Sequence, residues 1–223
     1  MNNDKKMKIS FYINMVITIL MINAIIMSIM GIKFMYGYEP AEDIVGVPIF
    51  SYFTIQSNIF IGIVSFIFAN KEYEIFKGKK KEIPKFYYIL KMVATVSVSL
   101  TFFIVFAYLG FITKGGHLPL LRNTNLFFHL VIPVLSIINY LIFEKNDCIK
   151  FRYTIYGIIP TIFYEIYYGI NLLVGMKDGK VHLTNDWYYF AQNGIINILI
   201  AVPSMIIVTY LLTLVIWRIN KKI

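Results

Sequence analysis

The chain has 223 residues, of which 58% are hydrophobic and 15% charged, and its mean hydropathy is +0.69. This composition is far more apolar than that of a soluble domain of similar length, so we expect an integral membrane protein with one domain, residues 1–223. In a soluble chain, a net charge of +9 would suggest a nucleic-acid partner. In a membrane protein, the distribution of the basic residues instead indicates which side of the membrane each loop faces. We therefore expect no nucleic-acid partner.

Six apolar stretches are long enough to cross a hydrocarbon core about 30 Å thick. Backbone polar groups inside a bilayer must be satisfied within the segment, and these stretches are too long for barrel strands. The sequence therefore predicts an all-α integral membrane protein, a six transmembrane helix bundle. The expected spans are residues 9–32, 50–69, 86–112, 125–143, 153–174 and 188–217.

Basic residues are distributed unevenly over the segments that join these spans. Fifteen lysines and arginines lie in the amino terminus, the second and fourth loops and the tail, whereas five lie in the other loops. By the positive-inside rule both termini are cytoplasmic. The basic loops are expected to meet anionic membrane lipids, and the isoleucine- and lysine-rich composition favours a bacterial plasma membrane.

The second span carries a stripe of small and polar residues at helical spacing. Such a stripe predicts a face turned into the bundle, where it serves either a site or close helix packing. Asn58 lies one turn from Thr54 and is expected to hydrogen-bond the threonine hydroxyl. The stripe consists of Ser51, Thr54, Asn58, Gly62 and Ser65.

The third span contains one charged residue, Lys91, about one turn from its cytoplasmic end. We expect its ammonium group to extend along the helix to the interface. The following loop contains His117, and His182 lies in the fifth loop. Neither has Cys, Asp or Glu at ligand spacing, so the sequence predicts no zinc site and no cofactor.

The fourth span places a histidine on a polar face. Asn125, His129, Pro133, Ser136 and Tyr140 share this face, with Asn139 beside it. An ionisable group inside a span is expensive and is therefore a functional candidate, although a structural hydrogen bond is the alternative. Pro133 has no N–H to bond the carbonyl of His129, which loosens the helix at the histidine.

Thr54 and His129 lie at matching positions in their spans. Both spans run from outside to inside, and each residue lies about four residues, roughly 6 Å, below the start of its span. Equal depth on inward faces is a necessary condition for a nucleophile and a base in contact. We therefore treat Thr54 and His129 as a candidate catalytic pair.

The fifth span contains Glu165, which we expect to be the only carboxylate well inside any span. It could orient an imidazole, bind a cation or take a proton, or it could be a protonated structural group bonded to a tyrosine such as Tyr168. Further carboxylates near the outer mouth are expected to be solvated: Glu39, Glu42, Asp43 and Asp186.

These segments resemble the androgen-induced family of six-helix membrane proteins and its bacterial relatives. The Y-F-T-x-x-S-N element is matched by Tyr52, Phe53, Thr54, Ser57 and Asn58. The His-Pro element and the ending of the fourth span are similar at His129, Pro133, Asn139 and Phe143. A later aromatic cluster is similar to Gly175, Trp187, Tyr188, Tyr189 and Phe190. The similarity runs from about residue 50 to 190.

Animal members of that family are threonine hydrolases that cleave fatty acid esters of hydroxy fatty acids. The resemblance implies Thr54 as nucleophile and His129 as general base. The chain departs from the animal proteins in three ways: Pro133 follows His129 by four positions instead of five, an amide replaces the usual acid near Asn139, and the fifth loop is longer.

Three functions are therefore compatible with the sequence. The first is a membrane-embedded hydrolase of a lipid-soluble ester near the outer leaflet, with Asn58 or Asn125 as oxyanion donor. The second is a small transporter or channel that uses His129 and Glu165. The third is a non-catalytic membrane protein that organises lipids or binds a partner. The sequence does not indicate which oligomeric state the protein has.

Overall fold

The computed structural model describes residues 3–35, 46–145, 147–177, 180–188, 190–191 and 195–222. Within these residues, six helical segments are long and apolar enough to cross a membrane, which confirms the number of long apolar helices and the predominantly helical fold expected from the sequence. They are Asp4–Met30, Phe53–Phe76, Lys85–Ile112, Thr124–Phe143, Phe151–Val174 and Ile196–Lys222.

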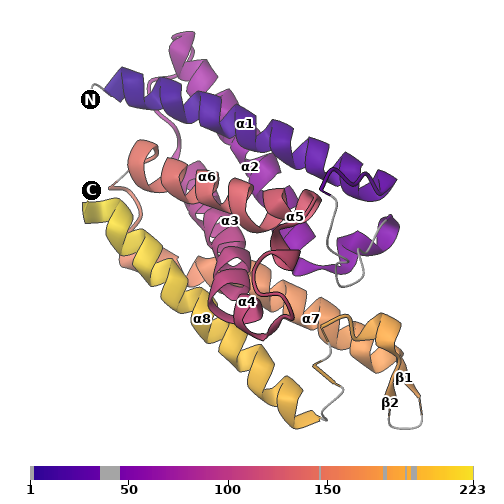
Figure 1. The fold of residues 1–223 in the computed structure, drawn as a ribbon. Coiled ribbons are helices and arrows are strands. Elements are labelled where there is room, and N and C mark those ends of the chain that lie inside the picture. The colour runs from indigo at the N-terminus through magenta and orange to yellow at the C-terminus, as the bar shows by residue number, and fades with distance from the viewer. Residues whose placement is uncertain are drawn as a thin grey trace.

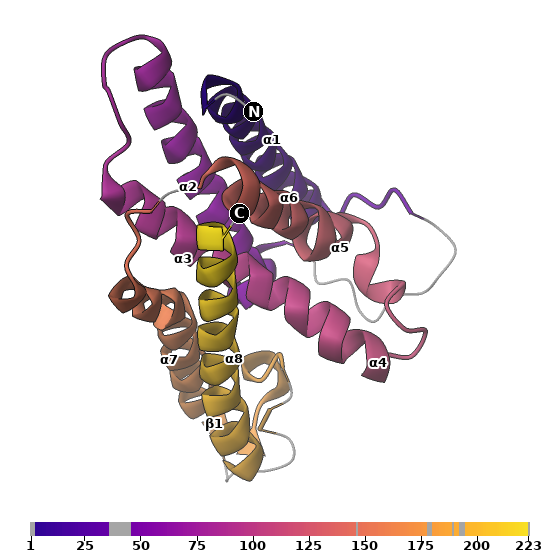
Figure 2. The ribbon, with the colours of Figure 1, turned by 90° about the vertical axis from the view of Figure 1, so that its left-hand side faces the viewer.

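Helix α3 (Lys85–Ile104) runs through the centre of the molecule, between two groups of helices (Figure 1 and Figure 2). Every residue of α3 from Lys91 to Thr101 is buried. On one side lie α1 (Asn3–Met30), α2 (Phe53–Phe76) and the fourth span, and on the other lie α7 (Ile159–Val174) and α8 (Ile195–Lys222).

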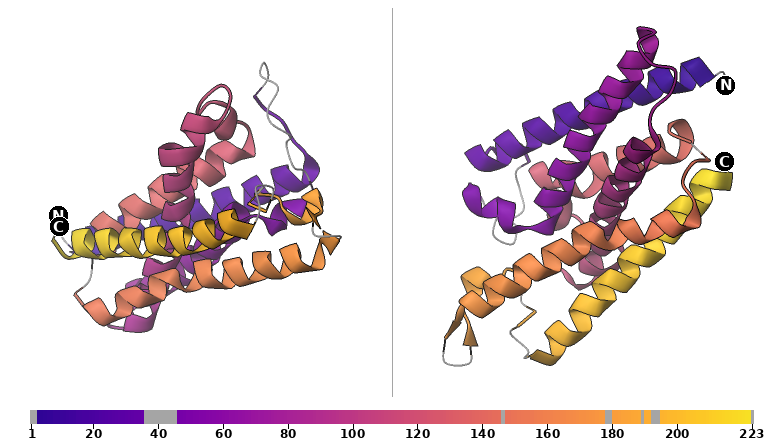
Figure 3. Two further views of the ribbon diagram at one scale, coloured as in Figure 1. Left: turned by 90° about the horizontal axis from the view of Figure 1, so that it is seen from below. Right: turned by 180° about the vertical axis from the view of Figure 1, so that it is seen from behind.

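Helix α1 begins and helix α8 ends at the same end of the bundle (Figure 3). We call this the terminal end and the opposite one the far end. The far end contains the loop that leads into α2 and the start of the fourth span, and the terminal end contains the turn between α2 and α3.

Three of the spans are interrupted helices. The third continues from α3 through a π-helical turn, Val105–Leu109, into α4 (Gly110–Ile112). Pro133 and Pro160 lie in the first turns of α6 (Ile132–Ile138) and α7, where a missing N–H is tolerated, whereas Pro203 lies inside α8. The fourth span consists of α5 (Thr124–Leu126), a π-helical turn (Phe127–Val131), α6 (Ile132–Ile138) and a second π-helical turn (Asn139–Phe143). The fifth begins with the 3-10 helix Phe151–Ile158, and shorter 3-10 turns are Val47–Ser51, Pro119–Leu121 and Leu183–Asn185.

Three helix ends differ from the expected spans by six or seven residues. Helix α1 begins at Asn3 instead of residue 9, α2 continues to Phe76, about two turns beyond residue 69, and α8 begins at Ile195 instead of residue 188. Before α8 the chain forms a short antiparallel hairpin of β1 (Met176–Lys177) and β2 (Lys180–Val181). The backbone N–H of Ala191 then donates to the Asp186 carboxylate at 3.0 Å, which bends the chain where a helix was expected.

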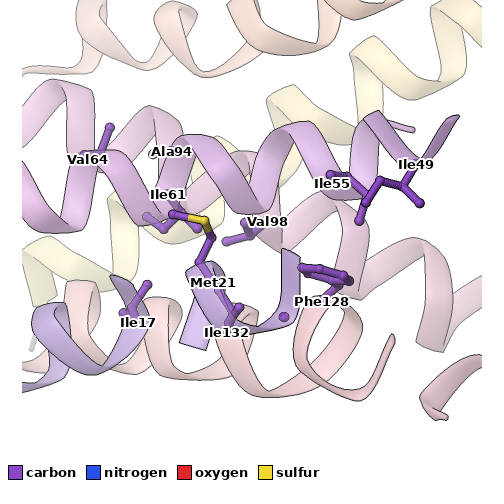
Figure 4. Packing of buried hydrophobic residues seen from close by; sticks show 11 residues of the cluster. Ile17, Met21, Ile49, Ile55, Ile61, Val64, Ala94, Val98, Phe128 and Ile132 are labelled. Carbon is purple, nitrogen blue, oxygen red and sulfur yellow. The ribbon is translucent and has the colours of Figure 1, made fainter. Parts of the chain in front are cut away.

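The face of α2 that carries the small and polar stripe packs against α1. A Cβ atom built on Gly62 would lie 2.9 Å from Cγ of Met21, so only glycine permits this approach. The Thr18 hydroxyl donates to the Gly62 carbonyl at 3.1 Å. Figure 4 shows the apolar side chains around this contact, to which Val98 of α3 and Ile132 of α6 also contribute. The inward orientation of the stripe is thereby confirmed.

Candidate functional site

A cavity of about 190 Å³ lies at the far end of the bundle. It is formed by the end of α1, the start of α2 and the start of the fourth span. Thr54, Asn125 and His129, three of the residues selected from the sequence, all line it. The remaining lining residues are Met27, Ser28, Gly31, Ile32, Lys33, Ile49, Tyr52, Ile55, Asn123, Thr124 and Phe128.

Thr54 is the second residue of α2. Tyr52, at the N-cap, gives no side-chain cap to this helix, and the backbone N–H of Phe53 donates to the Tyr188 hydroxyl at 3.0 Å instead. The start of the helix is thus fixed by a residue distant in the sequence. Within the described part of the chain the Thr54 hydroxyl has no hydrogen-bond partner, so it is available to a molecule in the cavity.

Asn58 joins the two helices that carry the candidate pair. Its amide nitrogen donates to the carbonyl of Thr54 at 2.7 Å and to the carbonyl of Phe128 at 3.1 Å. The expected hydrogen bond to the threonine hydroxyl is therefore replaced by one to the backbone. An amide nitrogen has two hydrogens. Both are used, and Asn58 has no N–H to offer a ligand.

The ring of His129 is held by a backbone carbonyl. Nδ1 of His129 lies 2.6 Å from the carbonyl oxygen of Leu120, in the 3-10 turn before the span. A carbonyl only accepts hydrogen bonds, so Nδ1 carries the hydrogen and Nε2 of the neutral ring presents a lone pair. Its position in a π-helical turn just before Pro133 agrees with the loosened helix predicted there.

Asn123 also lines the cavity, and no pattern in the sequence had pointed to it. Its side chain is 5% exposed, and its φ of 50° is the only positive value among described non-glycine residues. Oδ1 accepts hydrogen bonds from the backbone N–H groups of Phe34 and Met35, at 3.0 and 2.9 Å. The amide orientation is thus fixed, and Nδ2 has no acceptor within the described structure.

Glu165 and Tyr168 do not line this cavity. Glu165 is half-buried on α7, and the buried Tyr168 hydroxyl donates to Asp186. Asp186 is 1% exposed and so is not solvated as expected. Neither Glu165 nor Tyr168 orients His129, because the carbonyl of Leu120 does so. Glu39, Glu42 and Asp43 lie outside the described residues.

Aromatic rings connect α7 and the chain before α8 to the start of α2. Phe53 packs edge-on against Tyr164, which also contacts Tyr188. The Tyr164 hydroxyl donates to the Ser51 carbonyl at 2.8 Å and accepts from Nε1 of Trp187 at 2.9 Å. Burial raises the pKa of Tyr188 to about 12, so its phenol remains protonated at neutral pH. This aromatic cluster fixes the backbone on which Thr54 lies.

A second polar centre occupies the terminal end. Lys91 does not reach the interface: its side chain is fully buried, and Nζ lies 3.3 Å from the carboxylate of Glu144. Glu72 of α2 is 2% exposed. Glu165 is therefore not the only carboxylate inside the bundle. The two expectations, that Lys91 reaches the interface and that Glu165 is the only buried carboxylate, considered each helix alone. The partners of Lys91 come from other helices.

No group of three or more His, Cys, Asp or Glu residues that could hold a metal ion occurs in the part of the chain that the structure describes. Comparisons with protein-family models, with curated proteins and with solved structures found no match. The function of this chain is therefore inferred from the geometry of its own residues.

Proposed function

We propose that the chain is an integral protein of a bacterial plasma membrane with cytoplasmic termini, and that its far-end cavity is the active site of a lipid-ester hydrolase. The support for the topology is the six apolar helices together with the excess of basic residues at the terminal end. The far end then faces the outer leaflet, where an ester dissolved in the lipid would enter.

The observation that carries the proposal is that Thr54 and His129 line one cavity while Leu120 holds His129 in the tautomer that leaves Nε2 basic. A threonine hydroxyl is a weak nucleophile unless a neighbouring base takes its proton. His129 supplies that base, and the Leu120 carbonyl takes the orienting place that a carboxylate has in many hydrolases.

The reaction proceeds in two steps. His129 Nε2 takes the Thr54 proton as the hydroxyl oxygen attacks the ester carbonyl carbon, and the tetrahedral intermediate then loses its alcohol, which leaves with the proton from His129. In the second step a water gives its proton to His129 and attacks the acyl-threonine. The carboxylic acid leaves, and Thr54 regains its proton.

The negative oxygen of each intermediate needs fixed donors. Asn58 is unsuitable because its amide hydrogens bond the backbone, whereas Asn123 lines the cavity and its Nδ2 has no described acceptor. We assign Asn123 as the principal oxyanion donor, with Asn125 beside it. One such donor contributes on the order of 10²–10³-fold in rate.

The proposed substrate is a lipid-soluble carboxylic ester. The apolar helices around the cavity suit a substrate supplied by the membrane, and the resemblance to threonine hydrolases of lipid esters points to the same class. Transport through His129 and Glu165 receives less support, because Glu165 does not line the cavity that His129 lines. A non-catalytic role gives no reason for Thr54 and His129 to line one cavity.

The test is covalent labelling of the purified protein by a fluorophosphonate. We expect labelling of the wild type, its loss in Thr54→Val and in His129→Gln, and a reduction of at least about tenfold in Asn123→Asp, which keeps Oδ1 but has no N–H. Thr95→Val and His182→Gln are the matched controls and should label normally, since Thr95 is buried in α3 and His182 is exposed in a loop. Labelling that survives both Thr54→Val and His129→Gln would disprove the assignment.

A further inference from the structure

The buried polar centre at the terminal end joins four segments of the chain. Lys91 of α3 is fully buried, and Glu72 of α2 and Glu144 after the fourth span are 2% and 3% exposed. Asn14 of α1 lies between them: its Oδ1 accepts from Lys91, and its Nδ2 donates to Glu144 at 2.9 Å and to Glu72 at 3.3 Å. Ser65 accepts a further hydrogen bond from Lys91 at 2.8 Å.

The charges of this centre do not balance if every group is ionised. Among the described side chains, two carboxylates surround one ammonium group, which leaves one negative charge in a place that water does not reach. Tyr88 of α3, Tyr140 of the fourth span and Cys148 also lie near the carboxylates, and an ordinary phenol or thiol is neutral at pH 7. Helix α8 contributes an uncharged amide, that of Asn220. An uncompensated charge inside a bundle is so costly that one more positive charge must be present.

The hydrogen bonds distinguish the two carboxylates. Oε1 of Glu144 accepts short hydrogen bonds from Asn139 at 2.7 Å and from Asn14 at 2.9 Å, and it pairs with Lys91, whereas the Ser10 hydroxyl at 3.3 Å makes only a long contact. Two amide donors and an ammonium group together stabilise an ionised carboxylate. Glu72 has the Asn14 amide at 3.3 Å, beyond the usual hydrogen-bond range. Glu144 is therefore the ionised partner of Lys91, and Glu72 is the group that needs neutralising.

We propose that Glu72 is a proton-binding site, occupied at neutral pH and electrostatically coupled to the buried Lys91–Glu144 pair. Because all three side chains are shielded, a proton enters or leaves only when the terminal end opens locally. Protonation of Glu72 is thus linked to the packing of α1, α2, α3 and the end of the fourth span. This site lies at the opposite end from the proposed hydrolase and does not depend on it.

Infrared spectroscopy of the full-length protein in lipid vesicles tests the proposal directly. A protonated carboxyl group has a carbonyl-stretch band that ionised carboxylates lack and that shifts in D₂O. We expect the band of Glu72 at pH 7 in the wild type and its loss in Glu72→Gln. Glu74→Gln is the matched control on the same helix. Glu74 is paired with Lys71 and Lys80, each at 3.0 Å, so it is ionised and its substitution should leave the band unchanged.

Two further variants test the count of charges. In Glu144→Gln, Lys91 loses its partner and Glu72 should ionise to replace it, so the band should disappear although Glu72 is present. In Lys91→Met/Glu144→Gln, no ammonium remains and Glu72 should stay protonated, so the band should return. A band that survives Glu72→Gln, or a wild type without the band, would overturn the proposal.

Thermal unfolding as a function of pH gives an independent measurement. In the unfolded chain Glu72 ionises above about pH 4.3 like any glutamate, whereas the folded protein keeps its proton, so the wild type should lose stability as the pH rises from there through neutral, until Glu72 ionises in the folded state as well. Glu72→Gln has no proton to lose and should show a flatter profile. If sodium chloride raises the wild-type midpoint at fixed pH while choline chloride does not, a metal cation occupies the site and the proton assignment is wrong.

Discussion

The hydroxyl of Tyr188 lies 3.0 Å from the backbone nitrogen of Phe53, the residue that precedes Thr54. The first N–H groups of a helix have no partner within the helix, so the phenol takes the place of a missing N-cap. The start of α2, and with it the direction of the Thr54 side chain, therefore depends on the chain before α8.

Tyr188→Phe should lower the free energy of unfolding by about 1 kcal/mol, since it leaves the N–H of Phe53 without its acceptor. Fluorophosphonate labelling of Thr54 should slow at the same time. Chemical denaturation and the labelling rate provide the two measurements. Tyr12→Phe is the control, because Tyr12 is 67% exposed, and an equal effect in both variants would contradict the capping role.

Gly62→Ala should destabilise the fold by about 1–3 kcal/mol, because the added methyl group would meet Met21 at the contact between α1 and α2. Gly169→Ala in α7 is the matched control. Nothing lies within 4 Å of its added Cβ, so it should be neutral or slightly stabilising. Met21→Ala combined with Gly62→Ala should recover part of the loss, and simple additivity in this double-mutant cycle would argue against the clash.

Lys91→Met should cost about 3–5 kcal/mol, since it removes the ammonium group from a buried ion pair. Lys79→Met should change stability by less than about 0.5 kcal/mol, because Lys79 is exposed in the turn after α2. Thermal unfolding in the same detergent compares the two. Similar midpoints for both variants would show that Lys91 is solvated.

Asn123→Ala should be less stable than Asn123→Gly by about 1 kcal/mol. Both variants lose the hydrogen bonds to Phe34 and Met35, but only glycine adopts φ of 50° without strain. The denaturant midpoints of the two variants measure this difference in stability. A more stable alanine variant would show that the backbone relaxes at this position. Both should lose fluorophosphonate labelling if Asn123 is the oxyanion donor.

Hydropathy was sufficient to predict the number of helices, because about 20 apolar residues in a row have few other uses in a protein. That Thr54 and His129 line one cavity was also foreseeable, since successive spans alternate in direction and both residues then lie at the same depth. These predictions needed only chain direction and length.

The environment of Lys91 and the role of Asn123 were not foreseeable in this way. Lys91 is neutralised by Glu144 and bonded by Asn14, which lie on helices distant in the sequence. Asn123 owes its fixed amide to the backbone N–H groups of Phe34 and Met35. A hydropathy pattern carries no information on which helices are neighbours, and both features depend on that.

The burial of Lys91 has a consequence for how the chain is made. Asn14 and Ser65 precede Lys91 and can already receive its hydrogen bonds when α3 leaves the ribosome, but Glu144 is synthesised only after the fourth span. Until then Glu72 of α2 is the carboxylate at hand, and in its ionised form it supplies the counter-charge that the buried ammonium group needs. The partner of Lys91 therefore changes from Glu72 to Glu144 late, after more than half of the protein has been translated.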